Sequence, residues 1–116
     1  MKNVNYLLLL LVLLNSCAKE EDKKTTCDTT SVTYSSTIRS ILNDNCMNCH
    51  NSGSALGGVV LETHAQVAAY STSLNDVFYV SLTTATGAKK MPQGGSLPNC
   101  DIEKVKTWIE AGAPNN

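Results

Sequence analysis

The stretch Cys46-Met47-Asn48-Cys49-His50 is the part of this chain around which the rest can be interpreted. It has the pattern C-x-x-C-H, in which two thiols separated by two residues can reach one edge of a single flat ring, and an imidazole follows at once. Thiols at this spacing bond the vinyl groups of a haem, and the adjacent histidine ligates its iron. The motif predicts one covalently attached c-type haem per chain, linked to Cys46 and Cys49, with His50 as the proximal iron ligand.

Other chemistries also use a Cys-x-x-Cys pair. A redox dithiol of the thioredoxin type would lie beside a β-α-β pattern, and the sequence shows none. A structural zinc site would need a second pair of closely spaced ligands, but the other cysteines, at positions 17, 27 and 100, are isolated. Zinc, dithiol chemistry and chance recurrence of the motif remain the alternatives to haem.

The first 16 residues are expected to form a signal peptide of the lipoprotein type. Lys2 supplies a positive charge, and the apolar run 7–14 is shorter than the ~20 residues that a membrane span needs. Leu14-Asn15-Ser16-Cys17 resembles a bacterial lipobox, although Asn15 departs from the usual small or apolar residue. We therefore expect a lipid on Cys17. The alternative is an ordinary signal peptide in which this cysteine has no role.

Residues 17–30 are expected to be a flexible tether behind the lipidated cysteine. They are rich in charged residues and threonine and carry no large apolar side chain. The cluster Glu20-Glu21-Asp22 resembles the signal that directs some Gram-negative lipoproteins to the outer face of the outer membrane; a plain soluble spacer is the alternative. The expected location is therefore outside the cytoplasm, anchored by lipid in the outer membrane and facing the periplasm or the cell surface.

Two cysteines, Cys27 and Cys100, remain after lipidation and haem attachment are assigned. In an oxidising compartment they could form a disulfide. Such a bond would join the end of the tether to the start of the last helix and close a loop of about 70 residues, worth up to roughly 4 kcal/mol in the chain-entropy model. Two free thiols are the alternative.

Residues 31–116 are predicted to form one small all-α domain with three to five short helices. Apolar residues at helical spacing indicate helices over 32–49, 63–70, 73–82 and from Asp101 to about Gly112. The expected N-caps are Ser35 or Ser36, Thr63 and Asp101. Trp108 is expected to pack against the first helix. Because the whole chain has only six aromatic residues, a haem in the middle would supply much of the core.

A second stretch that carries chemistry surrounds Met91. An iron held by His50 on one side needs a second strong ligand if it is to carry electrons, and a thioether also raises its potential. Met91 stands in a loop beside Pro92, and we expect it to be the distal ligand. His64, the only other histidine, is the alternative ligand and is otherwise expected to be a surface residue. The lysines at 89 and 90 could offer a positive rim to a partner or could be merely solvated.

Three segments resemble the small class I, mono-haem cytochrome c domain of bacteria. They are the I-x-x-I-L-x-x-x-C-x-x-C-H opening at 38–50, the Met-Pro loop at 91–92, and the ending W-I-x-x-G-A at 108–113. The resemblance implies a cytochrome c-like fold wrapped around one haem, thioether links from both motif cysteines, and iron held between His50 and Met91. The chain departs from the family in having no proline between His50 and Pro92. A carbonyl near Leu56 to Val59 is therefore expected to hold the histidine ring.

Charge and motif content exclude several other functions. Residues 31–116 carry five Lys and Arg against six Asp and Glu, so there is no basic field for nucleic acid. The sequence lacks a carboxylate pair, a Ser-His-Asp order and a phosphate-binding loop. The expected function is a lipid-anchored electron carrier that serves redox partner proteins and is not itself an enzyme. The alternatives are a haem enzyme or gas sensor with an open or displaceable sixth ligand, and an accessory subunit of a larger redox complex.

Overall fold

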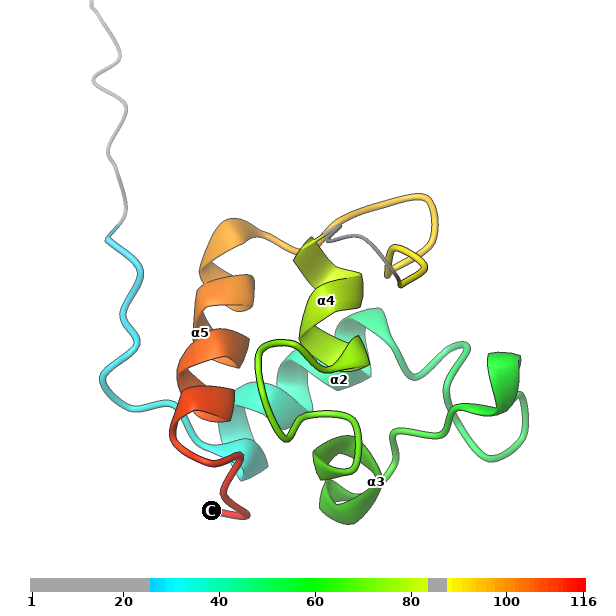
Figure 1. The fold of residues 1–116 in the computed structure, drawn as a ribbon, viewed down its shortest axis with the longest axis horizontal. Helices are drawn as coiled ribbons and strands as arrows, with labels where there is room; N and C mark the ends of the chain where they lie inside the picture. Colours follow the sequence, from blue (N-terminus) through cyan, green and yellow to red (C-terminus); the bar gives the residue numbers. More distant parts are fainter. Residues whose placement is uncertain (1–25, 84–87) are drawn as a thin grey trace, which may run out of the picture.

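The computed structural model describes residues 26–83 and 88–116, which form short helices joined by loops, with no β-strand in these two ranges. The all-α prediction is confirmed for this part of the chain (Figure 1). The predicted signal peptide, Cys17 and most of the tether lie outside the described residues. The elements are η1 (Tyr34–Ile38), α2 (Arg39–Asn45), η2 (Leu56–Gly58), α3 (His64–Ala68), α4 (Val77–Thr83) and α5 (Asn99–Glu110).

The described helices are all short. None of them has the length and apolar character needed to cross a membrane.

The first helix begins as a π-helical turn, η1, and continues as α2. Thr33 is its N-cap: the backbone there is extended, and its hydroxyl accepts a hydrogen bond from the Ser36 amide. The prediction of Ser35 or Ser36 as the cap was wrong because both residues already lie inside the turn, where the backbone cannot take the extended conformation of a cap. The helix ends at Asn45, four residues earlier than predicted, which leaves the Cys-x-x-Cys-His stretch in turns.

The start of α3 was predicted correctly from the sequence, whereas the start of α4 was not. Thr63 caps α3 as predicted, and it forms a reciprocal pair of hydrogen bonds with Gln66. The predicted start of the next helix at Ser73 was wrong, because residues 73–76 form a turn and α4 begins at Val77. In that turn the Asp76 carboxylate accepts hydrogen bonds from the amide and hydroxyl of Thr72.

The last helix, α5, starts two residues before the predicted cap. Pro98 occupies the N-cap position without a side-chain bond, and Asp101 lies in the first turn. A carboxylate there still favours the helix, because it faces the positive end of the helix dipole. At the other end the Gly112 backbone has a φ of 89°, a left-handed conformation suited to glycine, and the Ala113 amide donates to the Trp108 carbonyl at 2.9 Å.

The core lies where α5 packs against η1 and α4 (Figure 1). Trp108 is at its centre: the ring is 1% exposed, its centroid lies 5.8 Å from that of Tyr34, and Nε1 donates to the Pro114 carbonyl. The predicted contact between the last and first helices is therefore present. The buried apolar residues are Tyr34, Ile38, Ile41, Leu42, Leu61, Val67, Phe78, Leu82, Leu97, Val105, Trp108, Ile109 and Ala113.

Cys27 and Cys100 are joined by a disulfide. The bond links the segment before η1 to the first turn of α5, across a sequence separation of 73 residues. Cys27 is thereby fixed to the helix that carries the central tryptophan.

Candidate functional site

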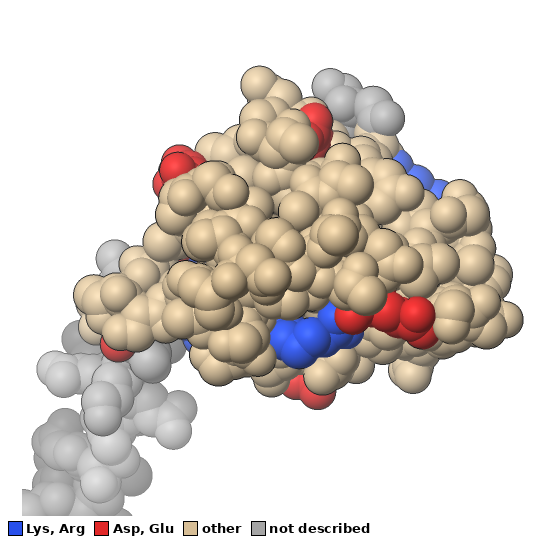
Figure 2. Space-filling model, turned by 90° about the horizontal axis from the view of Figure 1, so that it is seen from below, with Lys and Arg blue, Asp and Glu red and all other residues tan. Residues whose placement is uncertain are grey.

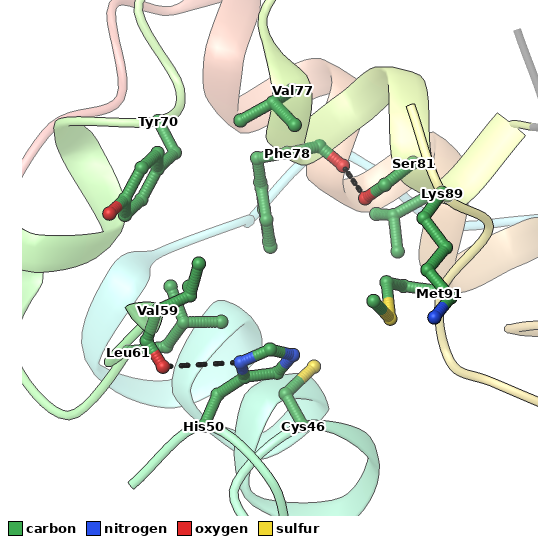
Figure 3. A pocket seen from close by; sticks show the side chains of 11 residues that line it. Cys46, His50, Val59, Leu61, Tyr70, Val77, Phe78, Ser81, Lys89 and Met91 are labelled. Atoms are coloured by element: carbon green, nitrogen blue, oxygen red, sulfur yellow. Dashed lines mark hydrogen bonds between the residues drawn. The ribbon is translucent and has the colours of Figure 1, made fainter. Parts of the chain in front are cut away.

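A cavity of about 140 Å³ lies between the turn that follows α2, the extended segment 59–61, α4 and the loop that contains Met91 (Figure 3). Most of its wall is apolar. The few polar groups on it belong to side chains that can bind metals, form hydrogen bonds or carry a charge. The lining residues are Cys46, His50, Val59, Leu61, Tyr70, Val77, Phe78, Ser81, Leu82, Lys89 and Met91. The cavity therefore brings together three of the four predicted haem-binding residues.

The His50 ring is oriented by the segment that faces it. Its Nδ1 lies 3.2 Å from the Val59 carbonyl, and its own carbonyl accepts a hydrogen bond from the Leu61 amide at 2.8 Å. Because a carbonyl can only accept, Nδ1 must carry the hydrogen, which leaves Nε2 of the neutral ring with a free lone pair. The prediction that a carbonyl between Leu56 and Val59 holds the ring is confirmed, and the residue is Val59.

Met91 faces the same space from the other side. Its sulfur points into the cavity across from the imidazole, and the second ring nitrogen of His50 points away from Val59 toward that side (Figure 3). The methionine lies on a loop, and its amide donates to the Ser81 carbonyl at the end of α4, at 2.9 Å. One backbone hydrogen bond thus attaches this sulfur donor to a helix.

The two motif cysteines have different surroundings. Cys46 is half-buried in the cavity wall, and burial raises the pKa of its thiol to about 11. The Arg39 guanidinium acts in the opposite direction but more weakly. A thiol with so high a pKa stays protonated at neutral pH, which is the reverse of a reactive dithiol. Cys49 is exposed and does not line the cavity, so the structure does not bring the fourth predicted residue into it.

His64, the alternative ligand, lies elsewhere. Its ring is packed edge-on against Tyr34 with 4.8 Å between centroids, it also contacts Trp108, and Nε2 lies 2.8 Å from the Ala113 carbonyl. The prediction of a surface residue was wrong, because these aromatic contacts half-bury the ring. His64 is not among the residues that line the cavity.

The mouth of the cavity combines an apolar and a basic side chain. Val77 is 52% exposed although it lines the cavity, and Lys89 lines it from the loop beside Met91. Lys90 is exposed next to it. On the face shown in Figure 2, charged side chains are few and form small separate groups, and most of the surface is uncharged.

Arg39 is a residue near the site that the sequence analysis missed. Its guanidinium donates to the carbonyls of Leu61 and Glu62, at the end of the segment that holds His50. One feature of the sequence could have pointed to this residue: Arg39 is the only Lys or Arg between Lys24 and Lys89.

Within residues 26–83 and 88–116, no three His, Cys, Asp or Glu side chains gather in a way that could hold a metal ion. The donors on the cavity wall are instead one imidazole, one thioether and one thiol. Comparison of the chain with protein-family models, curated proteins and solved structures found no significant match.

Proposed function

We propose that this protein is an electron carrier with one c-type haem, whose iron is held between His50 and Met91. The observation that carries the proposal is that an imidazole with a free Nε2 and a thioether sulfur face one apolar cavity from opposite sides. A histidine and a methionine are the ligand pair of electron-carrying cytochromes c. The resemblance of the sequence to class I mono-haem cytochrome c domains supports the same function.

The residues present fit such a group. The apolar walls suit the body of a porphyrin, and the soft sulfur and the imidazole suit iron. The Val59 carbonyl fixes the tautomer of His50 and makes its free nitrogen a stronger donor, as partners of metal-bound histidines do. When bound, the haem supplies one-electron exchange between ferrous and ferric iron.

Covalent attachment would use Cys46 and Cys49. Both thiols come from the turn that carries the proximal ligand: the amides of Cys49 and His50 both donate to the Cys46 carbonyl, at 3.2 and 3.0 Å. Cys46 already faces the cavity, whereas the exposed Cys49 side chain would have to rotate toward it. Two thioether links would keep the cofactor in place without help from a large core.

The rest of the proposed biology comes from the sequence. Residues 1–16 would direct export, a lipid on Cys17 would anchor the chain in the outer membrane, and residues 18–30 would tether the domain. The protein would pass electrons to redox partner proteins through the haem edge at the cavity mouth. In this proposal it makes and breaks no bond in a substrate.

The experiment is to express the chain with haem-maturation machinery and record visible spectra of the oxidised and reduced protein. We expect reversible one-electron reduction and no binding of carbon monoxide to the ferrous form, because both axial positions are filled. The C46S/C49S variant should lose the haem, whereas C27S/C100S, which also removes two cysteines, should keep it. Ready binding of carbon monoxide by the native ferrous protein would contradict the electron-carrier assignment and favour a sensor or an enzyme.

A further inference from the structure

We infer that Arg39 is a positioning residue, which sets the orientation of the His50 imidazole by clamping the segment 59–62 onto α2. The inference rests on the proposed function, and it adds to it the residue that controls the proximal ligand. The effect is indirect: it passes from the Arg39 side chain through the backbone of segment 59–62 to the His50 ring.

The first step is the attachment of the guanidinium to its own helix. Nε and Nη2 of Arg39 donate to the Asn43 side-chain oxygen, at 3.0 and 2.8 Å, one helical turn along α2. These two bonds hold the flat guanidinium at one angle. Its remaining nitrogen, Nη1, is thereby presented to the neighbouring segment. A lysine could not reproduce this fork, because its ammonium is a single point of donation.

The second step is the contact between Arg39 and the segment 59–62. Nη1 lies 3.0 Å from the Leu61 carbonyl and 2.8 Å from the Glu62 carbonyl. Hydrogen bonds from a charged donor are roughly twice as strong as neutral ones. Two successive carbonyls of an otherwise irregular stretch are therefore fixed to α2, and the Leu61 side chain is held in the core at 5% exposure.

The third step leads from this segment to the ring. The Leu61 amide donates to the His50 carbonyl at 2.8 Å, and the Val59 carbonyl lies 3.2 Å from Nδ1 of the same histidine. Residue 61 is thus bonded to Arg39 on its carbonyl side and to His50 on its amide side. If the clamp loosens, the carbonyl that orients the ring becomes mobile, and its bond to Nδ1 weakens.

The segment 59–62 has a second attachment beside the Arg39 clamp, and this one connects it to Ser52. The Glu62 carboxylate accepts hydrogen bonds from the Ser52 amide and hydroxyl, at 2.9 and 3.0 Å. It ties the same segment to the loop after His50 and uses the Glu62 carboxylate, not the backbone carbonyls that Arg39 contacts. Only Arg39 connects this segment to α2 through a charged side chain among the hydrogen bonds of the described residues.

The test measures amide hydrogen exchange in the full chain carrying Arg39→Met or Arg39→Lys. We expect the Leu61 amide to exchange at least about tenfold faster in R39M, a change of about 1.4 kcal/mol, and to an intermediate extent in R39K. The exchange rate of the Ile109 amide in α5 should change less than about twofold. K104M, which removes a positive charge from α5 that is paired with Asp101 and not with segment 59–62, is the matched control and should leave the exchange rate of the Leu61 amide unchanged.

In the haem-loaded protein the reduction potential should rise from wild type to R39K, which keeps the positive charge, because a weaker Nδ1 hydrogen bond makes His50 a poorer donor to ferric iron. An unchanged Leu61 amide in R39M, or equal acceleration at Ile109, would overturn the inference. If R39M does not fold, the exchange rates of the Leu61 and Ile109 amides in R39K test the inference instead. A chain that lacks haem but shows the local effect would refute the proposed function and leave the clamp standing.

Discussion

The two proposed iron ligands are held to very different degrees. His50 is bonded to the segment 59–61 through both its ring and its carbonyl. Met91 lies on a loop that one backbone hydrogen bond attaches to Ser81. The thioether is therefore the donor that can be changed with the least effect on the fold.

Met91→Ala should leave the protein folded and the haem attached, because the cysteines and His50 still hold it. We expect loss of the six-coordinate spectrum, binding of carbon monoxide by the ferrous form, and a fall in potential of about 0.1 V or more, within the ~0.8 V that axial ligands span. Met47→Ala, which removes a thioether beside the motif cysteines, should change neither spectrum nor potential. An M91A protein with an unchanged spectrum would rule out Met91 as the ligand.

Glu62 predicts a pH dependence of stability. Two hydrogen bonds from Ser52 lower the pKa of this carboxyl below its ordinary value of 4.5. The bond from the amide has the larger effect and the bond from the hydroxyl the smaller one. A depressed folded pKa stabilises the protein above the unfolded value, and this stabilisation is lost as the pH falls below about 4.5 and through the folded pKa. Urea unfolding between pH 7 and pH 3 should therefore depend less steeply on pH in E62Q than in wild type, whereas E103Q on α5 should retain the wild-type slope. Equal slopes in E62Q and wild type would contradict the prediction.

At the residue scale, sequence motifs could predict which side chains come together but not all of their orientations. Cys46, His50 and Met91 line one cavity, and the carbonyl that holds His50 lies in the predicted range. The exposure of Cys49 could not be predicted, because it depends on how the turn after α2 is rotated. The burial of His64 depends on aromatic neighbours that are distant in sequence.

At the scale of the elements, hydrophobic periodicity predicts helix faces better than helix ends. Four residues of the apolar stripe predicted for the first helix, Tyr34, Ile38, Ile41 and Leu42, are buried, but the fifth, Cys49, is exposed and lies beyond the helix. The N-cap is Thr33 and not a serine two or three residues later. The last helix likewise begins at Asn99 after Pro98, before the predicted aspartate. An end depends on the backbone conformation of one residue, and several neighbouring Ser, Thr or Asp residues satisfy the same sequence rule.

A pair of substitutions tests the corrected N-cap. Thr33→Ala should lower the free energy of unfolding by about 1 kcal/mol, because it removes the acceptor of the Ser36 amide. Ser35→Ala, inside the helical turn, should change it by only a few tenths of a kcal/mol. Denaturant unfolding of both variants measures the difference. A larger loss of unfolding free energy in S35A than in T33A would indicate that the N-cap is the serine predicted from the sequence.

The disulfide between Cys27 and Cys100 should be a main source of stability for so small a domain. For a sequence separation of 73 between its ends, the chain-entropy model gives a contribution of about 4 kcal/mol. C27S, C100S and the double variant should therefore lose similar amounts of unfolding free energy, since each removes the same bond. Losses under about 1 kcal/mol would indicate that the cross-link does not constrain the unfolded chain.

At the scale of the whole molecule, the helices build a core on one side and leave an apolar cavity on the other. Trp108 and its neighbours between α5, η1 and α4 form the packed part (Figure 1). The cavity has Val77 half exposed at its mouth and a cysteine, an imidazole and a thioether in its wall. Covering large apolar side chains with a flat apolar cofactor would bury surface that this short chain cannot cover by itself.

The proposed function depends on a haem bonded covalently to this polypeptide. The most direct measurement is the mass of the denatured chain, purified from a host with haem-maturation machinery, together with its alkaline pyridine spectrum. We predict a polypeptide mass increased by that of one haem, with the spectrum of a haem whose vinyl groups are both saturated, and loss of the increase in C46S/C49S. A denatured chain that lacks the added mass of haem and shows no haem spectrum would contradict this prediction.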